Sequence, residues 1–347
     1  MDVSAFKMGS VGSRALNPVY TNSGFTIYAF KKAAESEDFV CNTVINGSSM
    51  TYNPSTQLLS GSATIPIGTY KFLPVYGLAN APAGTIPSNM IGQVLTDDLL
   101  INQVQASVLP EIFLMDGPAA DLTRYDMGLD NENPNPTVTA TLKRAVARVD
   151  ILFISATKDD AGNYVEAEMT DKDILGNGAL QAMSLSFTNL NQSMNFFGIK
   201  SGGTFSDAMT FPLANLNNRI TIGSGTQTIV ENDDYANFDN VQAGDIIRGS
   251  AHIGGLYFVP NSDATATVGL TMVLTNNNDE QRTVRISTGG NNLLPLARNM
   301  VTLVKVYVVR PDNPVIPPPT VFDTNVKFEI EIDQVWLGSN TVVGEMN

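Results

Sequence analysis

The chain is poor in the side chains on which disulfide scaffolds and most enzyme sites depend. Its 347 residues include one cysteine, Cys41, and one histidine, His252. A single cysteine excludes an intrachain disulfide and a cysteine-based zinc site, so we expect Cys41 to be a small buried hydrophobe. His252 lies in the stretch SAHIGGL with no GxSxG sequence near it, and we expect a packed strand histidine rather than a catalytic base. The sequence therefore predicts no catalytic residues and no enzyme.

Charge is also scarce, and positive charge is nowhere clustered. Charged residues make up 16% of the chain, which carries a formal net charge of −14. Nucleic acid is therefore not an expected partner. The acids of Glu231–Asp234 offer oxygen ligands to calcium but lack EF-hand spacing, and neighbouring acids in turns are usually solvated, so we predict no metal and no cofactor. The paired acids are Asp97–Asp98, Asp159–Asp160, Asp233–Asp234 and Asp279–Glu280.

Long apolar runs are missing as well. No stretch is long and apolar enough to span a bilayer as a helix, and the first residues, MDVSAFKMGS, lack the apolar core of a signal peptide. The protein is then either cytoplasmic or numbered from a point after its export signal, and the residues alone leave both options open.

What the chain does have is a series of short apolar runs separated by Gly, Asn and Pro turns. Such a series favours β-sandwiches over alternating strands and helices. One stretch, Leu95–Val104, is expected to be a short helix. The predicted strands are Gly24–Phe30, Val40–Ile45, Ser49–Tyr52, Tyr70–Leu78, Ile246–Val259, the hairpin of Thr265–Thr275 and Arg282–Thr288, and Val301–Val309.

The length predicts about two domains, and the linker-like DNENPNP of Asp130–Pro136 marks the expected boundary. We expect an N-terminal β-sandwich domain over residues 1–135 and a second over 136–310. The second would open with Thr137–Ser155, where a helix competes for LKRAVARVD but the β-branched continuation VDILFIS favours a strand.

Residues 311–347 form a proline-rich linker and a last strand. The prolines of RPDNPVIPPPT favour an extended connector, and VKFEIEIDQVW after it alternates apolar and acidic residues with the period of a strand. This strand either folds back on its own domain or completes a sheet in another molecule. Its apolar face consists of Val326, Phe328, Ile330, Ile332 and Trp336.

The N-terminus combines a possible strand, Val3–Met8, with the flexible stretch GSVGS and the pair Arg14–Ala15. An arginine after such a stretch is an accessible cut site for an arginine-specific protease, although the local residues alone favour an ordinary surface arginine.

Seven segments carry a resemblance to a known family over most of the chain. They are SRALNP from Ser13, GFTIYAF from Gly24, IPIGTYKFLPVYG from Ile65, ATLKRAVARVDI from Ala140, LYFVPN from Leu256, LARNMVTLVKVYV from Leu296 and VKFEIEIDQVW from Val326. With these segments the chain resembles the fimbrillin family, the type V pilin subunits of Bacteroidales surface fimbriae.

The resemblance implies an all-β fold of two transthyretin-like β-sandwich domains in series with a C-terminal extension. It implies export through the outer membrane to the cell surface as a lipoprotein precursor, with the lipid-bearing cysteine and the signal preceding residue 1. It also implies cleavage between Arg14 and Ala15 by an arginine-specific protease, which removes residues 1–14 and opens a groove in the N-terminal domain.

The function expected from the resemblance is polymerisation into fimbriae that support adhesion. The strand of Val326, Phe328, Ile330, Ile332 and Trp336 would fill the groove of the next subunit. Expected partners are further copies of the chain, other fimbrial subunits, the protease, and receptors on host or bacterial surfaces. The alternative is a surface β-sandwich lipoprotein that binds glycan or protein ligands without polymerising.

Overall fold

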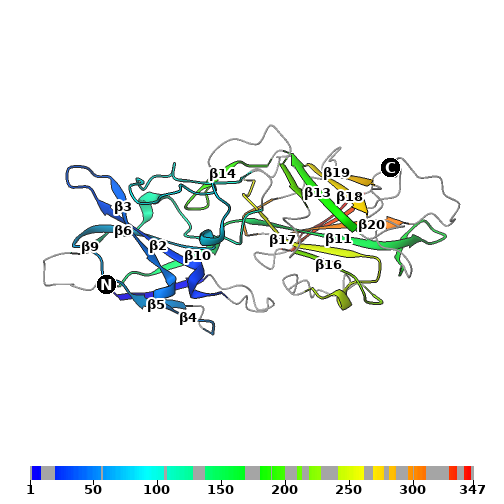
Figure 1. Ribbon diagram of the computed structural model, residues 1–347, viewed down its shortest axis with the longest axis horizontal. Helices are drawn as coiled ribbons and strands as arrows, with labels where there is room; N and C mark the ends of the chain where they lie inside the picture. The colour runs from blue at the N-terminus through cyan, green and yellow to red at the C-terminus, as the bar shows by residue number, and fades with distance from the viewer. Residues whose placement is uncertain are drawn as a thin grey trace.

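A computed structural model describes residues 2–8, 20–55, 58–104, 108–127, 137–168, 180–188, 190–199, 209–212, 219–227, 241–261, 269–276, 281–286, 296–299, 301–309, 328–333 and 340–344. These residues form strands and short 3-10 helices and contain no α-helix, which confirms the all-β prediction. None of the helices in this part of the chain is long and apolar enough to cross a membrane. The strands gather in two groups along the long axis of the molecule (Figure 1).

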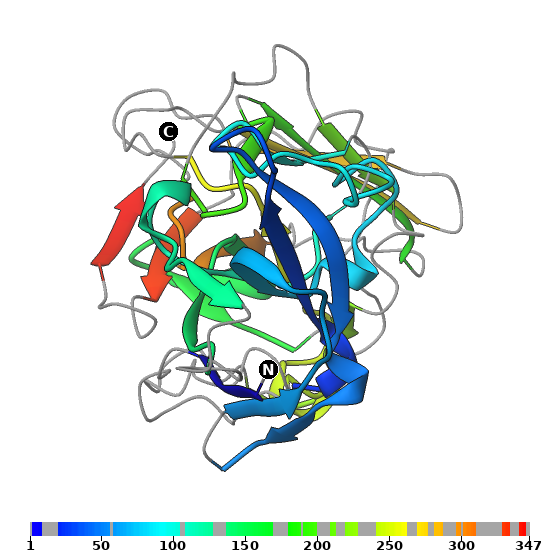
Figure 2. The ribbon, with the colours of Figure 1, turned by 90° about the vertical axis from the view of Figure 1, so that its left-hand side faces the viewer.

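The first group is built on a nine-stranded sheet with the order β3-β2-β6-β8-β10-β1-β5-β4, in which β9 also pairs with β6. Figure 2 views the molecule from the end at which this group lies. Its strands are β1 (Asp2–Met8), β2 (Phe25–Lys32), β3 (Phe39–Asn46), β4 (Thr51–Asn53), β5 (Leu58–Ser62), β6 (Gly68–Tyr76), β8 (Phe113–Leu114), β9 (Tyr125–Met127) and β10 (Ala140–Arg144).

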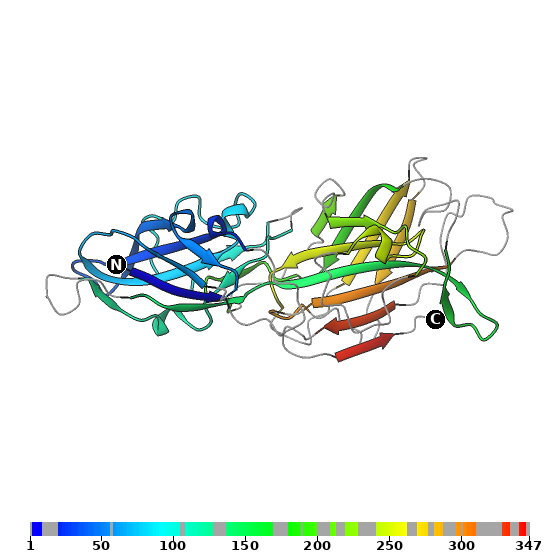
Figure 3. The same cartoon turned by 90° about the horizontal axis from the view of Figure 1, so that it is seen from below.

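The second group consists of a seven-stranded sheet, β16-β17-β11-β20-β21-β22 with β12 on β11, and a four-stranded sheet, β15-β13-β18-β19. The four-stranded sheet forms a second layer above the other (Figure 3). The strands are β11 (Ala147–Lys158), β12 (Tyr164–Glu166), β13 (Leu180–Thr188), β15 (Met209–Pro212), β16 (Ile220–Ile222), β17 (Ala251–Phe258), β18 (Gly269–Asn276), β19 (Gln281–Ile286), β20 (Val301–Val309), β21 (Phe328–Asp333) and β22 (Asn340–Gly344).

Strands β2 and β6 are central because both of their faces are apolar. Successive side chains of a strand point to opposite faces. Phe25 and Ile27 of β2 therefore enter one hydrophobic cluster, with Tyr70 and Phe72 of β6. Side chains that point to the opposite face enter a second cluster. Tyr28 and Phe30 of β2 belong to it, together with Leu73 and Val75 of β6.

The run Thr137–Ser155 is extended, as the β-branched residues favour, and it passes from one strand group into the other. β10 pairs with β8 and β1, whereas β11 pairs with β17 and β20 (Figure 3). The change occurs at Ala145–Val146, later than the boundary expected at residue 135. The linker at Asp130–Pro136 lies outside the described residues, so the division into two transthyretin-like domains remains a prediction.

The two strand groups share buried apolar side chains. Met194, Phe196 and Tyr257 belong to the same hydrophobic cluster as Tyr28 of β2. The rings of Tyr28 and Phe196 meet edge to face, with centroids 6.0 Å apart. Water is therefore excluded along the junction between the groups.

A short two-stranded sheet also crosses this junction. The prediction of a helix over Leu95–Val104 was wrong, because part of this stretch forms a strand of that sheet. β7 (Leu100–Asn102) pairs antiparallel with β14 (Ser193–Asn195). Leu99 and Ile101 are buried, and the Asp97 carboxylate accepts the Ala119 N–H at 3.0 Å. These long-range contacts outweigh a local helix propensity.

We predict that Phe196→Ala lowers the free energy of unfolding by about 3–5 kcal/mol, because the ring is fully buried. Since the cluster joins both strand groups, calorimetry should show one transition at a lower temperature. The matched control is Ile199→Ala, whose side chain is 42% exposed and whose loss should cost about 0.5 kcal/mol or less. Two separate transitions, only one of them shifted, would contradict the shared core.

Candidate assembly site

The N-terminal strand β1 is an interior strand of the nine-stranded sheet. It pairs antiparallel with β5 on one side and parallel with β10 on the other. Phe6 lies opposite Leu59 and Ala140, and Met8 lies opposite Leu142. A register shift between Val3 and Phe6 marks a bulge in the pairing with β5. Taking β1 away would therefore leave two unpaired edges facing each other.

The strands that flank β1 have one buried face and one exposed face. Leu59 of β5 and Leu142 of β10 are fully buried in the same hydrophobic cluster. Their neighbours in the chain, Ser60 and Thr141, are exposed. We call this position between β5 and β10 the slot. A strand that occupies it has one apolar and one solvated side.

The expected cut site, Arg14 and Ala15, lies outside the described residues. The first described residue after it is Tyr20, which is buried against Tyr76 and Phe113. Burial, and then the Glu111 carboxylate, raise the pKa of the Tyr20 hydroxyl. The chain is therefore firmly packed from Tyr20 onward.

The C-terminal tail folds back on its own sheet, one of the two placements that the sequence left open. β21 pairs antiparallel with β20, so that Phe328, Ile330 and Ile332 lie opposite Val306, Val304 and Thr302 in the register. β22, which the sequence analysis did not predict, pairs with β21 and forms the outer edge (Figure 3). Val326 and Trp336 fall outside the described residues. β21 and the slot lie in different strand groups.

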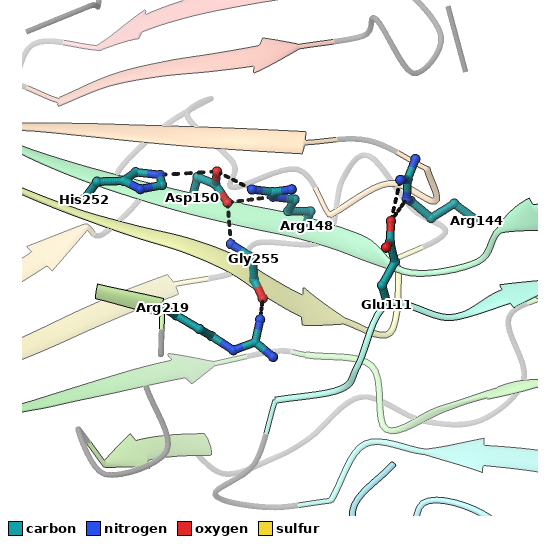
Figure 4. A network of polar contacts seen from close by, with 7 residues as sticks. All are labelled: Glu111, Arg144, Arg148, Asp150, Arg219, His252 and Gly255. Atoms are coloured by element: carbon teal, nitrogen blue, oxygen red, sulfur yellow. Dashed lines mark hydrogen bonds and ion pairs between the residues drawn. The ribbon is translucent and has the colours of Figure 1, made fainter. Parts of the chain in front are cut away.

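Three charged side chains of the run Ala140–Lys158 are buried and paired, namely Arg144, Arg148 and Asp150, which the alternation of the sequence did not indicate. Asp150 is fully buried and accepts two hydrogen bonds from Arg148, at 2.8 and 3.0 Å (Figure 4). Burial alone would raise the pKa of the Asp150 carboxyl, but Arg148 and His252 outweigh it and hold that pKa well below its usual range.

His252 is the packed strand histidine that the sequence predicts. It is 3% exposed, and its Nε2 lies 3.4 Å from Asp150. Gly254 and Gly255 form a bulge opposite Asp150, which lets the carboxylate accept the Gly255 N–H at 2.8 Å. Gly255 has a φ of +65° and Arg219 donates to its carbonyl, so this geometry favours glycine (Figure 4). The cluster has the contacts of a structural network.

A second pair joins the buried Arg144 of β10 to the partly buried Glu111, beside the junction of the strand groups (Figure 4). The Arg144 guanidinium also lies over the Phe113 ring, 4.8 Å from its centroid. An apolar run that contains charged residues could have indicated such buried pairs, because a charge is tolerated in a core only with a partner. The identity of the partner, Glu111, could not be deduced from the sequence.

The remaining candidates form no reactive cluster in the part of the chain that is described. Cys41 is buried as expected, and burial raises the pKa of its thiol to about 11. Asp159 accepts hydrogen bonds from the turn that follows it, including the Asn163 N–H at 2.7 Å. Within the described ranges no group of three or more metal-ligating side chains occurs. The calcium candidate Glu231–Asp234 lies outside them.

Comparison with solved structures finds proteins from Bacteroides and Parabacteroides species that are similar to this chain. A candidate cell adhesion protein from Bacteroides ovatus is 12% identical, over 99% of this chain and 96% of that one, with a TM-score of 0.43. A fimbrial assembly protein from Parabacteroides distasonis is 11% identical, over 99% and 98%, with a TM-score of 0.41. No protein-family model and no curated protein matches the chain. Likeness at this level carries no argument about function.

We predict that Asp150→Asn lowers the free energy of unfolding by about 3–5 kcal/mol at neutral pH, because Arg148 would stay buried without its counter-charge. The pKa of Asp150 is lower in the folded than in the unfolded protein. Its stabilisation is therefore fully present above the usual Asp pKa of about 3.9 and is lost as the pH falls towards the depressed value.

Denaturant titrations from pH 7 to pH 2 test this prediction. The difference in free energy of unfolding between the wild type and Asp150→Asn should become smaller below about pH 4. Asp160→Asn is the same change at an exposed turn position. Its free energy of unfolding should stay within about 0.5 kcal/mol of the wild-type value at each pH. A gap that stays constant with pH would show that the carboxylate charge is not what stabilises the fold.

Proposed function

We propose that this chain is a structural pilin subunit that polymerises head to tail into surface fimbriae. The observation that carries the proposal is the interior place of β1 between β5 and β10. A protease cut at Arg14–Ala15 would release β1 from the chain, and the C-terminal strand of another copy would then occupy the slot. Export as a lipoprotein and an arginine-specific protease as maturation partner belong to the same proposal.

The physical reason for strand exchange is the pair of edges that β1 would leave behind. Unpaired strand edges readily accept another chain, and an inserted strand gains main-chain hydrogen bonds along with burial of its apolar side chains. The tail alternates Phe328, Ile330 and Ile332 with acidic residues, which suits a slot with one apolar and one solvated side. Each buried apolar side chain contributes about 1.5–3 kcal/mol before entropy is counted.

The tail strand would have the same number of neighbouring strands in the slot as it has in its own sheet. In its own subunit, β21 has a strand on each side, β20 and β22. In the slot it would again have two neighbours, β5 and β10. An inserted strand that ran in the direction of β1 would be antiparallel to β5 and parallel to β10. Because slot and tail lie in different strand groups, the contact is head to tail and grows without closing.

The alternative function is a surface adhesin that binds a glycan or protein without polymerising. The observation that favours it is the tail itself, which is paired on both sides within its own sheet. A subunit with β1 and the tail in place is complete. Polymerisation then depends on the cut, and this dependence separates the two functions.

We expect an arginine-specific protease to cut the wild-type chain at Arg14 and to produce a ladder of oligomers. Arg14→Lys should resist this protease and stay monomeric, yet be cut by trypsin and then form the same ladder. Arg124→Ala removes an exposed arginine elsewhere and should behave as the wild type. Gel electrophoresis and light scattering measure the result. Cut subunits that stay monomeric would favour the adhesin.

We predict that Ile330→Asp, on the apolar side of the tail, leaves cutting intact but reduces the yield of oligomers at least about tenfold, because a buried charge would disfavour insertion. Glu331→Gln, one position along, should assemble as the wild type does. The thermal unfolding of each uncut variant serves as the folding control. Normal assembly of Ile330→Asp would exclude this segment as the donor.

A further inference from the structure

The hairpin of β4 and β5 is joined to the rest of its sheet through a single strand. β4 pairs with β5, and β5 pairs with β4 and β1. Among the described residues, neither strand of the hairpin pairs with any other strand. The main-chain ladder of β1 is thus the link between this hairpin and β10.

Few side chains of the hairpin reach the core. Leu59 is the one fully buried side chain of β5, and Thr51 and Asn53 of β4 are exposed. Tyr52 is partly buried, with its ring 5.7 Å from that of Phe25. Little apolar area therefore holds the hairpin in place once its ladder to β1 is lost.

The base of the hairpin is fixed more firmly than its body. The Asn22 side chain donates to the Met50 carbonyl at 3.0 Å, and Met50 is buried. A Cβ on Gly47 would lie 2.2 Å from the Asn22 carbonyl oxygen, so the chain passes very close to its neighbour there. A movement of the hairpin would therefore pivot at residues 47–50.

We propose that the β4–β5 hairpin is a jaw that closes on whichever strand occupies the slot and opens when the slot is empty. A two-stranded hairpin on its own is marginally stable in water, so without β1 the jaw would depend chiefly on the core contacts of Leu59 and Tyr52 and on its anchored base. Local opening of this kind occurs in segments with few buried apolar contacts.

The jaw gives the slot a side entrance, and this consequence rests on the proposed function. An incoming strand would pair first with β10, whose place is fixed by β8, and the jaw would then close and add the β5 ladder. The strand need not thread lengthwise between two fixed edges. The slow step of assembly would be closure of the jaw on the inserted strand.

Hydrogen exchange on the full, uncut chain tests the jaw without requiring polymerisation. Lys7→Pro removes a main-chain donor where β1 lies opposite both Leu58 and Thr141. We expect the amides of residues 51–53 and 58–62 to exchange at least about tenfold faster, while those of β2 and β3 change less than about twofold. Asp2→Pro, at the first residue of β1, is the matched control and should leave the hairpin protected.

Two results would overturn the proposal. Unchanged protection of residues 58–62 in Lys7→Pro would show that side chains alone hold the hairpin. Equal loss of protection in β2 and β3 would show that the hairpin does not open as a separate unit. Neither result depends on the oligomer ladder after proteolysis, so the jaw and the proposed polymerisation can fail separately.

Discussion

The passage of residues 140–158 through both strand groups is the constraint on which the structure depends. Its first part, β10, forms one wall of the slot that β1 occupies. Its second part, β11, pairs with β20, which holds the tail strand β21. The run is fixed by the pair of Arg144 with the partly buried Glu111 and by the buried pair of Arg148 with Asp150. The slot and the tail strand, which the proposed function makes the acceptor and the donor, are thus tied to one segment.

Under the proposed function, this arrangement would let one chain fold as a monomer before it is cut. β1 lies between β5 and β10, and the tail strand β21 lies between β20 and β22. The junction between the strand groups is packed and crossed by the β7–β14 pair, which keeps slot and tail apart within one molecule. Strand exchange between copies would keep the number of main-chain ladders around the tail strand nearly constant. The direction of assembly would then be decided by side chains and by the irreversibility of the cut.

Much of the fold follows from local sequence, because a period of two identifies strands wherever one face is buried. Val301–Val309 is the strand that was predicted, and β18 and β19 form the expected hairpin. The helix prediction for Leu95–Val104 was wrong because β7, which lies in this stretch, pairs with β14, a strand that is distant in sequence. The burial of Arg144, Arg148 and Asp150 could not be predicted from the run itself, because it depends on partners such as Glu111 and His252 that are distant in sequence. The interior position of β1 and the return of the tail on β20 depend on long-range pairing, which no local pattern encodes.

The most direct test of the central claim is a cross-linking experiment on a mixture of isotopically heavy and light subunits. Lys143 is exposed on β10 beside the slot, and Lys327 lies at the start of the tail strand. An amine cross-linker should join Lys143 of one copy to Lys327 of another after cutting at Arg14, and not before. Two results would contradict the account. One is that no heavy–light link forms between these lysines after cutting, and the other is that the link is equally abundant in uncut protein.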